Sequence, residues 1–248
     1  MRTILAYLAA LIFTPSISAM VVISGMLGRR DHPGSIFDWA PRTWSRILLF
    51  AAGAQVVVHG DEHRRGTQHV FVANHVSWFD VFVMAAHLRW FKFVAKAELF
   101  RIPLFGPAMR TAGMIAIDRK NQKSAHGSIQ EAAERIHEGA SVILFPEGTR
   151  GRTYALRPFK KGAFVLAIEA QAPVVPVAIH GSIEVQAKGQ IRVRAGRIDV
   201  HFLPPILTAG MSYDDRDALA RTAYARIAEC LEREYGVVSP VLPEPRSA

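Results

Sequence analysis

The amino-terminal stretch from Thr3 to Gly28 contains no charged residue and is flanked by arginines at both ends. It is longer than the roughly 20 apolar residues that a helix needs to cross a bilayer. A cleaved signal peptide ending near Ala19 is the alternative interpretation. Apolar residues continue from Met20 to Ile23, beyond that cleavage point. We therefore expect a retained helix that lies in lipid.

A second apolar-periodic stretch runs from Trp39 to Val58, with tryptophan and arginine side chains near its start. Such side chains suit the headgroup region of a membrane, which predicts an interfacial helix. We expect residues 1–58 to form a helical hairpin that anchors the chain, either across the bilayer or in one leaflet. Residues 59–238 are expected to form one domain, and residues 239–248 a disordered tail.

Short apolar runs alternate with helical patterns in the body of the chain. Strands are predicted at Val70–Ala73, Phe91–Lys96, Met114–Ile117, Ser141–Phe145 and Val174–Ile179, and helices from about Trp78, near Pro107–Ala112, at Ser124–His137 and at Phe159–Gln171. This order predicts an α/β fold with a mixed, mostly parallel sheet flanked by helices. Residues 191–193 and 198–202 are predicted to form a hairpin, and residues 212–235 a closing helix.

The chain carries 30 Lys and Arg residues against 21 Asp and Glu, a net charge of +9. This balance favours an anionic partner such as a phospholipid surface, nucleic acid or an acidic protein. The apolar amino terminus argues against nucleic acid as the partner. The basic residues lie at strand ends without interleaved aromatic residues, which also argues against a nucleic-acid binder. A single cysteine, Cys230, excludes an internal disulfide and a cysteine-based metal cluster. The spacings of His59, His63, His69 and His75 match no familiar zinc pattern.

A histidine and a carboxylate follow the first predicted strand. His75 comes two residues after Ala73, at the edge of the sheet where α/β proteins place their chemistry. Asp80 lies five residues further on, a spacing that an ideal helix rotates by about 140°. The two side chains meet only if a turn intervenes, and Asn74 and Ser77 are residues that form turns and caps.

The pair of His75 and Asp80 suits the abstraction of a proton from a hydroxyl group, because the carboxylate stabilises the imidazolium that forms. Ser77 is too near in the chain to attack through this histidine, which argues against a serine hydrolase. The plain alternative is a structural histidine at a strand end.

Two further strand ends carry arginines that suit an anionic oxygen. Arg119 follows the apolar run that ends at Ile117, and Arg150 follows a strand that Pro146 stops. Gly148, between Pro146 and Arg150, allows an unusual backbone angle. The guanidinium of each arginine offers two donors to a phosphate. The alternative for each arginine is an ordinary solvated surface charge.

Four stretches of this sequence together resemble the motifs of the 1-acylglycerol-3-phosphate acyltransferase family. They are Asn74-His75-x4-Asp80, Gly113 to Arg119, Phe145 to Arg150, and Val175-Pro176-Val177-Ala178-Ile179. The resemblance spans about Val70 to His180. The apolar amino terminus resembles the two-helix membrane anchor of bacterial members. The resemblance thus implies the inner membrane, with the catalytic domain on the cytoplasmic side.

The resemblance implies transfer of a fatty acyl group from an acyl thioester to the free hydroxyl of a lysophospholipid, so that 1-acyl-sn-glycerol-3-phosphate becomes phosphatidic acid. His75 would take the hydroxyl proton, Asp80 would orient the imidazole, and Pro176 with its apolar neighbours would line the path of the acyl chain. The substrate-binding residues that the resemblance implies are Lys96, Arg119, Glu147, Gly148, Thr149, Arg150 and Lys161.

The implied chemistry needs no metal and no bound organic cofactor, and the cosubstrate would be acyl-CoA or an acylated acyl carrier protein. An acceptor of another kind, a lyso-aminolipid such as lyso-ornithine lipid, fits the same resemblance, although the arginines favour a phosphate. A different class of function is a non-catalytic membrane scaffold that binds anionic lipid. The pairing of His75 with Asp80 argues against that scaffold.

Overall fold

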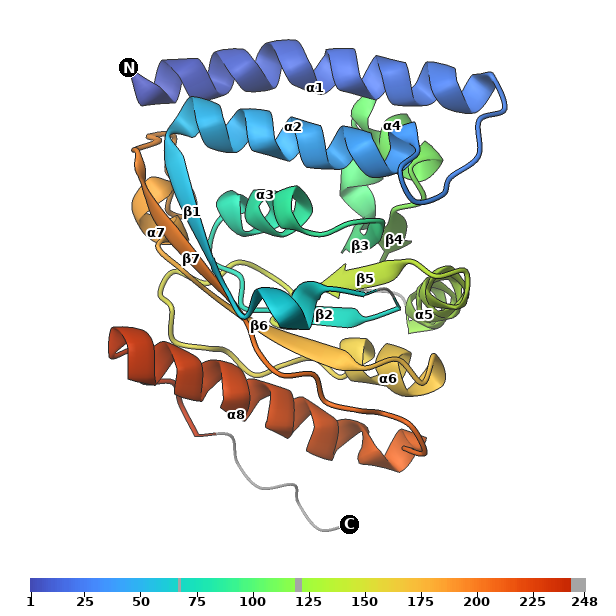
Figure 1. The fold of residues 1–248 in the computed structure, drawn as a ribbon, viewed down its shortest axis with the longest axis vertical. Helices are drawn as coiled ribbons and strands as arrows, with labels where there is room; N and C mark the ends of the chain where they lie inside the picture. Colours follow the sequence, from blue (N-terminus) through green and yellow to red (C-terminus); the bar gives the residue numbers. More distant parts are fainter. Residues whose placement is uncertain (67, 119–121, 242–248) are drawn as a thin grey trace.

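The computed structural model shows one seven-stranded sheet with helices on both faces (Figure 1). It describes residues 1–66, 68–118 and 122–241, without the side chains of residues 122–125. The strands are β1 (Ala54–His59), β2 (Val70–Ala73), β3 (Phe91–Lys96), β4 (Ile115–Ile117), β5 (Ser141–Leu144), β6 (Val174–His180) and β7 (Gly196–Phe202). The helices are α1 (Arg2–Met26), α2 (Ile36–Ala52), α3 (Trp78–His87), α4 (Phe105–Thr111), α5 (Gln122–His137), α6 (Gly162–Glu169), α7 (Ser182–Val185) and α8 (Arg216–Tyr235).

The strand order is β1-β7-β6-β2-β5-β3-β4. The five strands from β6 to β4 run parallel, whereas β7 is antiparallel to β6 and carries β1 parallel to itself. All four residues of β2 are buried, as apolar strands are when helices cover both faces of a sheet. The prediction of a mixed, mostly parallel sheet flanked by helices is confirmed. The carboxyl ends of β2, β5 and β3 therefore meet at one edge.

Helices α1, α2 and α3 lie on one side of the sheet, and α6 and α8 lie on the other (Figure 1). One apolar core, which includes Phe71, Met84 and Phe202, fills the first side, and a second core with Phe164 and Leu166 fills the other. A buried side chain of this size stabilises the fold by about 1.5–3 kcal/mol. The two cores together hold the sheet edge in place between their helices.

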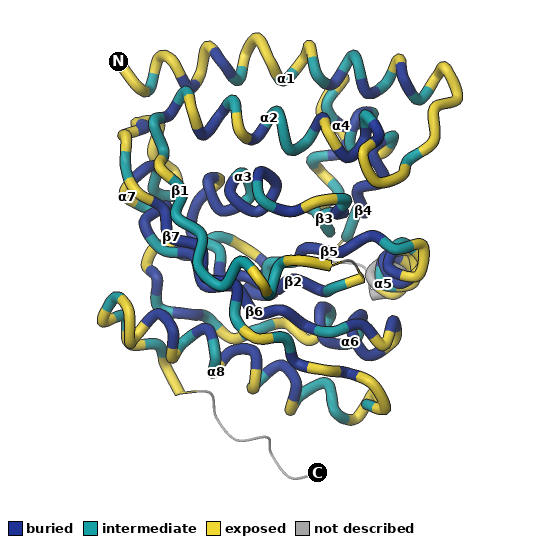
Figure 2. Tube along the Cα trace, in the orientation of Figure 1, coloured by how far each residue is buried: buried dark blue, intermediate teal, exposed yellow. Residues whose placement is uncertain are grey.

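Helix α1 lies against α2 and α4, and its inner face is made of small residues such as Ala6, Ala9 and Ser24. Its outer face exposes apolar side chains, visible as the yellow segments at the top of Figure 2. They include Ile4, Leu8, Leu11, Ile12 and Ile23. Within the described part of the chain, α1 is the helix whose length and composition would allow it to cross a membrane.

The prediction of one helix from Trp39 to Val58 is wrong, because α2 ends at Ala52 and Gly53 takes a left-handed conformation. Residues 54–59 then form β1 at the edge of the sheet. A short run of valines is compatible with a helix or a strand when read alone, and here pairing with β7 decides for the strand.

The hairpin predicted near the carboxyl terminus is also wrong. Residues 191–193 form no strand, and β7 pairs with β1 and β6 instead of forming a local hairpin. The start of the expected disordered tail is held, because Leu156 N–H donates to Ser239 Oγ at 3.0 Å and the Tyr224 hydroxyl donates to the Pro240 carbonyl at 2.7 Å. The rest of that tail, residues 242–248, lies outside the described residues. Strands β2 and β3 have the predicted ends, and the other predicted elements are present with shifted ends.

Candidate active site

The turn after β2 is fixed by the side chain of Asn74, which pairs with the backbone of β6. Its amide nitrogen donates to the Ile179 carbonyl at 2.9 Å, and its oxygen accepts from Ile179 N–H at 2.7 Å. Asn74 is fully buried, so these bonds replace the hydrogen bonds to water that burial removes. The chain therefore leaves the sheet at a defined point immediately before His75.

The structure brings His75 and Asp80 together through the turn that their spacing requires. Ser77 is the N-cap of α3 in an extended conformation, and Ser77 and Asp80 form a capping box. Asp80 Oδ2 lies 2.9 Å from His75 Nδ1 and also accepts from the backbone N–H groups of Val76 and Ser77 at 2.6 and 2.8 Å. The amino terminus of α3 favours the negative charge of this carboxylate. A proton on Nδ1 leaves Nε2 of His75 free to accept another.

The imidazole of His75 stacks on the ring of Phe145, with ring centroids 4.1 Å apart and planes inclined by 21°. The backbone of His75 is held on both sides, since its N–H donates to Glu147 Oε1 at 2.7 Å and its carbonyl accepts from Gly151 N–H at 2.7 Å. The loop after β5 therefore fixes the histidine. Phe145 is the last residue of the strand predicted at Ser141–Phe145, and no role in the site was predicted for it.

Glu147 lies behind the histidine, against its backbone. Its side chain is only 2% exposed, and Arg157 Nε donates to Glu147 Oε2 at 3.0 Å. Burial raises the pKa of Glu147, while the hydrogen bonds from His75 N–H and Arg157 oppose that rise. Arg157 also donates to the Thr149 carbonyl. Arg157 is a second residue at the site without a predicted role.

A cavity of about 960 Å³ opens beside His75, on the side of the sheet that α1 to α4 cover. Its walls are mostly apolar and come from α1, α2, α3, α4 and β3. Of the predicted site residues, His75, Lys96, Gly148, Thr149 and Arg150 line it. A pocket of this size and character is typical of a small-molecule site with a long apolar part.

Helix α1 supplies one whole wall of the cavity. The residues Ala6, Ala10, Thr14, Ile17 and Val21 line it, at successive spacings of four, four, three and four residues. This spacing places them on one helix face, and at about 1.5 Å per residue they extend over about 22 Å. The pattern was present in the sequence, but the apolar run was interpreted only as a lipid-facing helix.

The guanidinium of Arg150 lies 4.7 Å from the centre of the Trp78 ring. Partial burial lowers the pKa of Arg150, and the charge of Asp80 opposes this effect. Gly148 has φ of +76°, as the sequence predicted, and a Cβ there would meet the side chain of Lys160 at 2.8 Å. This loop therefore brings a cation and its own backbone to the cavity wall close to His75.

Two further residues named in the sequence analysis, Lys161 and Pro176, do not line the cavity. Lys161 lies at the start of α6 and pairs with Asp217 of α8, with 2.9 Å between Nζ and Oδ1, on the opposite face of the sheet. Pro176 is buried inside β6 and is not among the residues that line the cavity. Arg119 lies outside the described residues. Lys96 is at the cavity but pairs with Glu98 at 2.9 Å.

Residues 55–180 match the model of the family described as Acyltransferase, and the chain belongs to this family. The 1-acyl-sn-glycerol-3-phosphate acyltransferase of Limnanthes douglasii is 38% identical over 173 residues, which cover 69% of this chain and 61% of that protein. The 1-acyl-sn-glycerol-3-phosphate acyltransferase alpha of Homo sapiens is 37% identical over 177 residues, which cover 70% of this chain and 62% of that protein. The chain thus spans less than two thirds of the length of these relatives.

A solved structure has the same fold. The crystal structure of the 1-acyl-sn-glycerophosphate (LPA) acyltransferase PlsC from Thermotoga maritima superimposes with a TM-score of 0.79 at 23% identity, covering 96% of this chain and 97% of that one. The family membership that the four motifs indicated is confirmed.

Proposed function

We propose that this chain transfers a fatty acyl group from an acyl thioester to the free hydroxyl of a lysophospholipid, with 1-acyl-sn-glycerol-3-phosphate as the acceptor and phosphatidic acid as the product. The observation that carries this proposal is the contact of 2.9 Å between His75 Nδ1 and Asp80 Oδ2, with the imidazole on the wall of a large apolar cavity. The names of the relatives support this choice of acceptor.

In the proposed reaction, Nε2 of His75 accepts the proton of the acceptor hydroxyl while that oxygen attacks the thioester carbonyl. Asp80 stabilises the imidazolium that forms. When the carbon–sulfur bond breaks, the proton passes from the imidazolium to the leaving thiolate. The acyl group is then an ester of the acceptor, and no covalent bond to the protein is needed. A base of this kind contributes about 10²–10⁴-fold to the rate.

The acyl chain occupies the cavity between the sheet and α1, because the cavity walls there are apolar. Arg150 binds the acceptor phosphate, since its guanidinium lines the cavity and offers two donors to an anionic oxygen. Arg119 would add a second guanidinium. Glu147 positions the backbone of His75 and does not bind the acceptor.

The pair of helices α1 and α2 anchors the protein, and the α/β domain begins with β1. We place α1 flat in one leaflet, because it packs lengthwise on α2 and α4 and exposes apolar side chains on its other side. Lipid chains then reach the cavity wall formed by α1 without crossing water. The orientation that we propose is the cytoplasmic face of the inner membrane, where acyl-CoA or an acylated carrier protein serves as donor.

The decisive experiment is an acylation assay with the purified protein in detergent. Lysophosphatidic acid and lyso-ornithine lipid are each combined with acyl-CoA and with acylated carrier protein. We expect phosphatidic acid from the phosphate acceptor. Acylation of lyso-ornithine lipid alone would show that the proposed acceptor is wrong.

The role of the histidine is tested with His75→Ala, which should lose about 10²–10⁴-fold in acylation rate. It should still sediment with membranes. The control is His32→Ala, which changes an exposed histidine in the connection between α1 and α2. Unchanged turnover by His75→Ala would favour a lipid-binding scaffold.

A further inference from the structure

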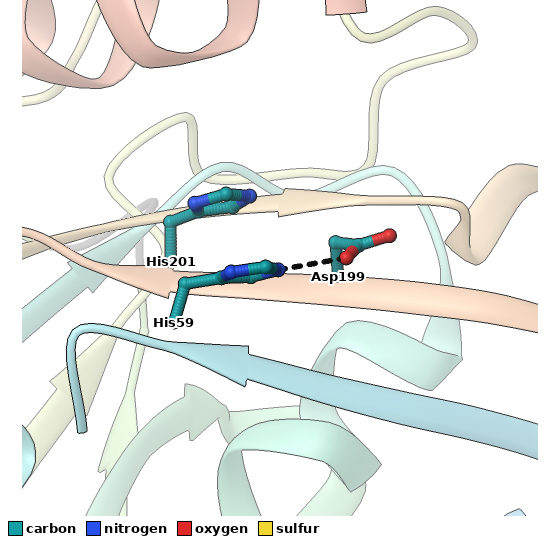
Figure 3. Close-up of side chains that lie close together, drawn as sticks. All are labelled: His59, Asp199 and His201. Atoms are coloured by element: carbon teal, nitrogen blue, oxygen red, sulfur yellow. Dashed lines mark hydrogen bonds and ion pairs between the residues drawn. The ribbon is translucent and has the colours of Figure 1, made fainter. Parts of the chain in front are cut away.

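A second group of chemically active side chains lies at the other end of the sheet, away from the cavity. His59 at the end of β1 is opposite His201 of β7 in the parallel pairing of these strands. Asp199 precedes His201 by two residues, so that both side chains point to the same face. Figure 3 shows the two rings one above the other with the carboxylate beside them.

The distances in this group are those of neighbouring ligands. His59 Nε2 lies 2.8 Å from Asp199 Oδ1, and the rings of His59 and His201 are stacked with centroids 4.1 Å apart. Each of the three residues offers one donor atom, and all three atoms lie within 4.8 Å of one another. Within the ranges that the structure describes, these three residues are the group of His, Cys, Asp or Glu side chains whose ligand atoms lie this close together.

We propose that His59, Asp199 and His201 bind a divalent transition-metal ion, with zinc as the best match. Two imidazoles and one carboxylate form a donor set typical of such ions, with metal–ligand distances of about 2.0–2.2 Å. Because the three ligand atoms already lie within 4.8 Å of one another, rotation of the side chains is enough to bring them around one ion. The side chain of His59 is 41% exposed, which gives the ion an entry path and leaves a coordination position for water.

Two further side chains contact this group. Arg197 donates to both oxygens of Asp199, at 2.8 and 2.6 Å, and its side chain is 61% exposed. Asp199 is buried whereas the guanidinium of Arg197 reaches water, so Arg197 can turn into solvent when a cation takes its place beside the carboxylate. The Tyr235 hydroxyl lies 2.6 Å from His201 Nε2 and completes the surroundings of the buried ring.

The ion binds on the opposite face of the sheet from the cavity. Ile198, Val200 and Phe202 belong to the core under α2 and α3, so the alternate residues Asp199 and His201 face α8. A bound ion joins the edge strand β1 to β7, next to the end of α8 where Tyr235 lies. Its effect is on stability and not on acyl transfer, which makes this proposal independent of the proposed function.

The test measures zinc bound by the tag-free full-length protein in detergent, by equilibrium dialysis with elemental analysis. We expect one zinc ion per chain and a higher melting temperature with zinc. His59→Ala and Asp199→Asn should each weaken binding by at least about tenfold, because even partners outside the ligand set cost about that much in metal sites. His137→Ala, at an exposed histidine of α5, should bind zinc as the unmodified chain does.

A further variant separates a metal site from a plain hydrogen-bond network. Arg197→Ala removes the cation that competes for Asp199, so it should bind zinc more tightly. Cobalt is the second probe, because ligation by the two imidazoles gives visible absorption bands that His59→Ala loses. Zinc binding that is equal in His59→Ala and the unmodified chain would overturn the proposal, and so would weaker binding by Arg197→Ala.

Discussion

The backbone N–H of His75 donates to Glu147 Oε1 at 2.7 Å, although 72 residues separate the two in the chain. The carboxylate of the third motif therefore sets the position of the histidine in the first. Arg157 holds the other oxygen of Glu147 at 3.0 Å. These three residues form a chain of contacts from the surface to His75.

We expect Glu147→Ala to lower kcat by about 10–100-fold, the range that corresponds to losing a hydrogen bond to a charged group. Glu147→Gln keeps an acceptor for His75 N–H but loses the charge that Arg157 binds, so its loss should be smaller. Arg157→Ala should lower kcat with little change in KM for either substrate.

The two positions should act as one unit. Steady-state kinetics of Glu147→Gln, Arg157→Ala and the double variant should give non-additive losses in kcat. Strictly additive losses would mean that Arg157 does not act through Glu147.

Asp80→Asn should lower kcat by about 10²–10⁴-fold while the protein stays folded, because an amide does not stabilise the imidazolium of His75. The chain offers a matched control, since Ser212 and Asp215 form the same capping box before α8 with no histidine attached. Asp215→Asn loses the same kind of cap and should keep its activity. Equal activity losses in both variants would assign Asp80 to capping alone.

The contact between His75 and Asp80 could be predicted from sequence because it is local. Five residues separate the two, and the turn and cap formers between them leave few ways to arrange that segment. The parallel strands could also be predicted from the sequence, since each is a short apolar run between helical patterns.

Long-range partners could not be predicted in this way. β1 was interpreted as helix, because its apolar run continues that of α2 and its partner β7 lies some 140 residues further along. Lys161 was assigned to the substrate because the family resemblance implied it, whereas its position at the start of α6 takes its side chain to Asp217. Neither the pairing of β1 with β7 nor the ion pair of Lys161 with Asp217 can be recognised from the residues next to it in the chain.

Arg150 and Lys161 provide a direct test of this difference between sequence and structure. Arg150→Ala should raise KM for a lysophospholipid acceptor by about tenfold or more, since a charge-assisted hydrogen bond contributes about 1.5–3 kcal/mol. Lys161→Ala removes only an exposed ion pair with Asp217, and its kinetics should match those of the unmodified chain. A raised acceptor KM in Lys161→Ala alone would contradict the placement of the two cations.

The cavity wall on α1 should set the length of acyl chain that is used. Thr14 lines the cavity about midway along that wall and accepts a hydrogen bond from Trp44 Nε1 at 3.0 Å. Thr14→Phe fills part of the space, so kcat/KM should fall for long-chain donors and be kept for short ones. Donors of increasing length measure this shift. The control Leu11→Phe lies on the exposed face of α1, and an identical chain-length profile in both variants would contradict the assignment of the cavity.

The stability of the fold should depend on pH through two half-buried histidines, His87 and His69. Burial lowers the pKa of His87, against the effect of its hydrogen bond to the Val83 carbonyl, and burial also lowers the pKa of His69. The unfolded chain takes up these protons near pH 6.5, whereas the folded chain takes them up only at lower pH. The stability from these groups is therefore complete above about pH 6.5 and is lost as the pH falls through the folded pKa values.

Urea unfolding at about pH 7.5 and 5.5, on either side of the ordinary histidine pKa, should show a lower free energy of unfolding at the acidic pH. His87→Gln cannot titrate, so its loss between the two values should be smaller than that of the unmodified chain. His137→Gln changes an exposed histidine of α5 and should show the full loss. An equal pH dependence in all three proteins would mean that His87 takes up its proton in the folded chain as readily as in the unfolded one.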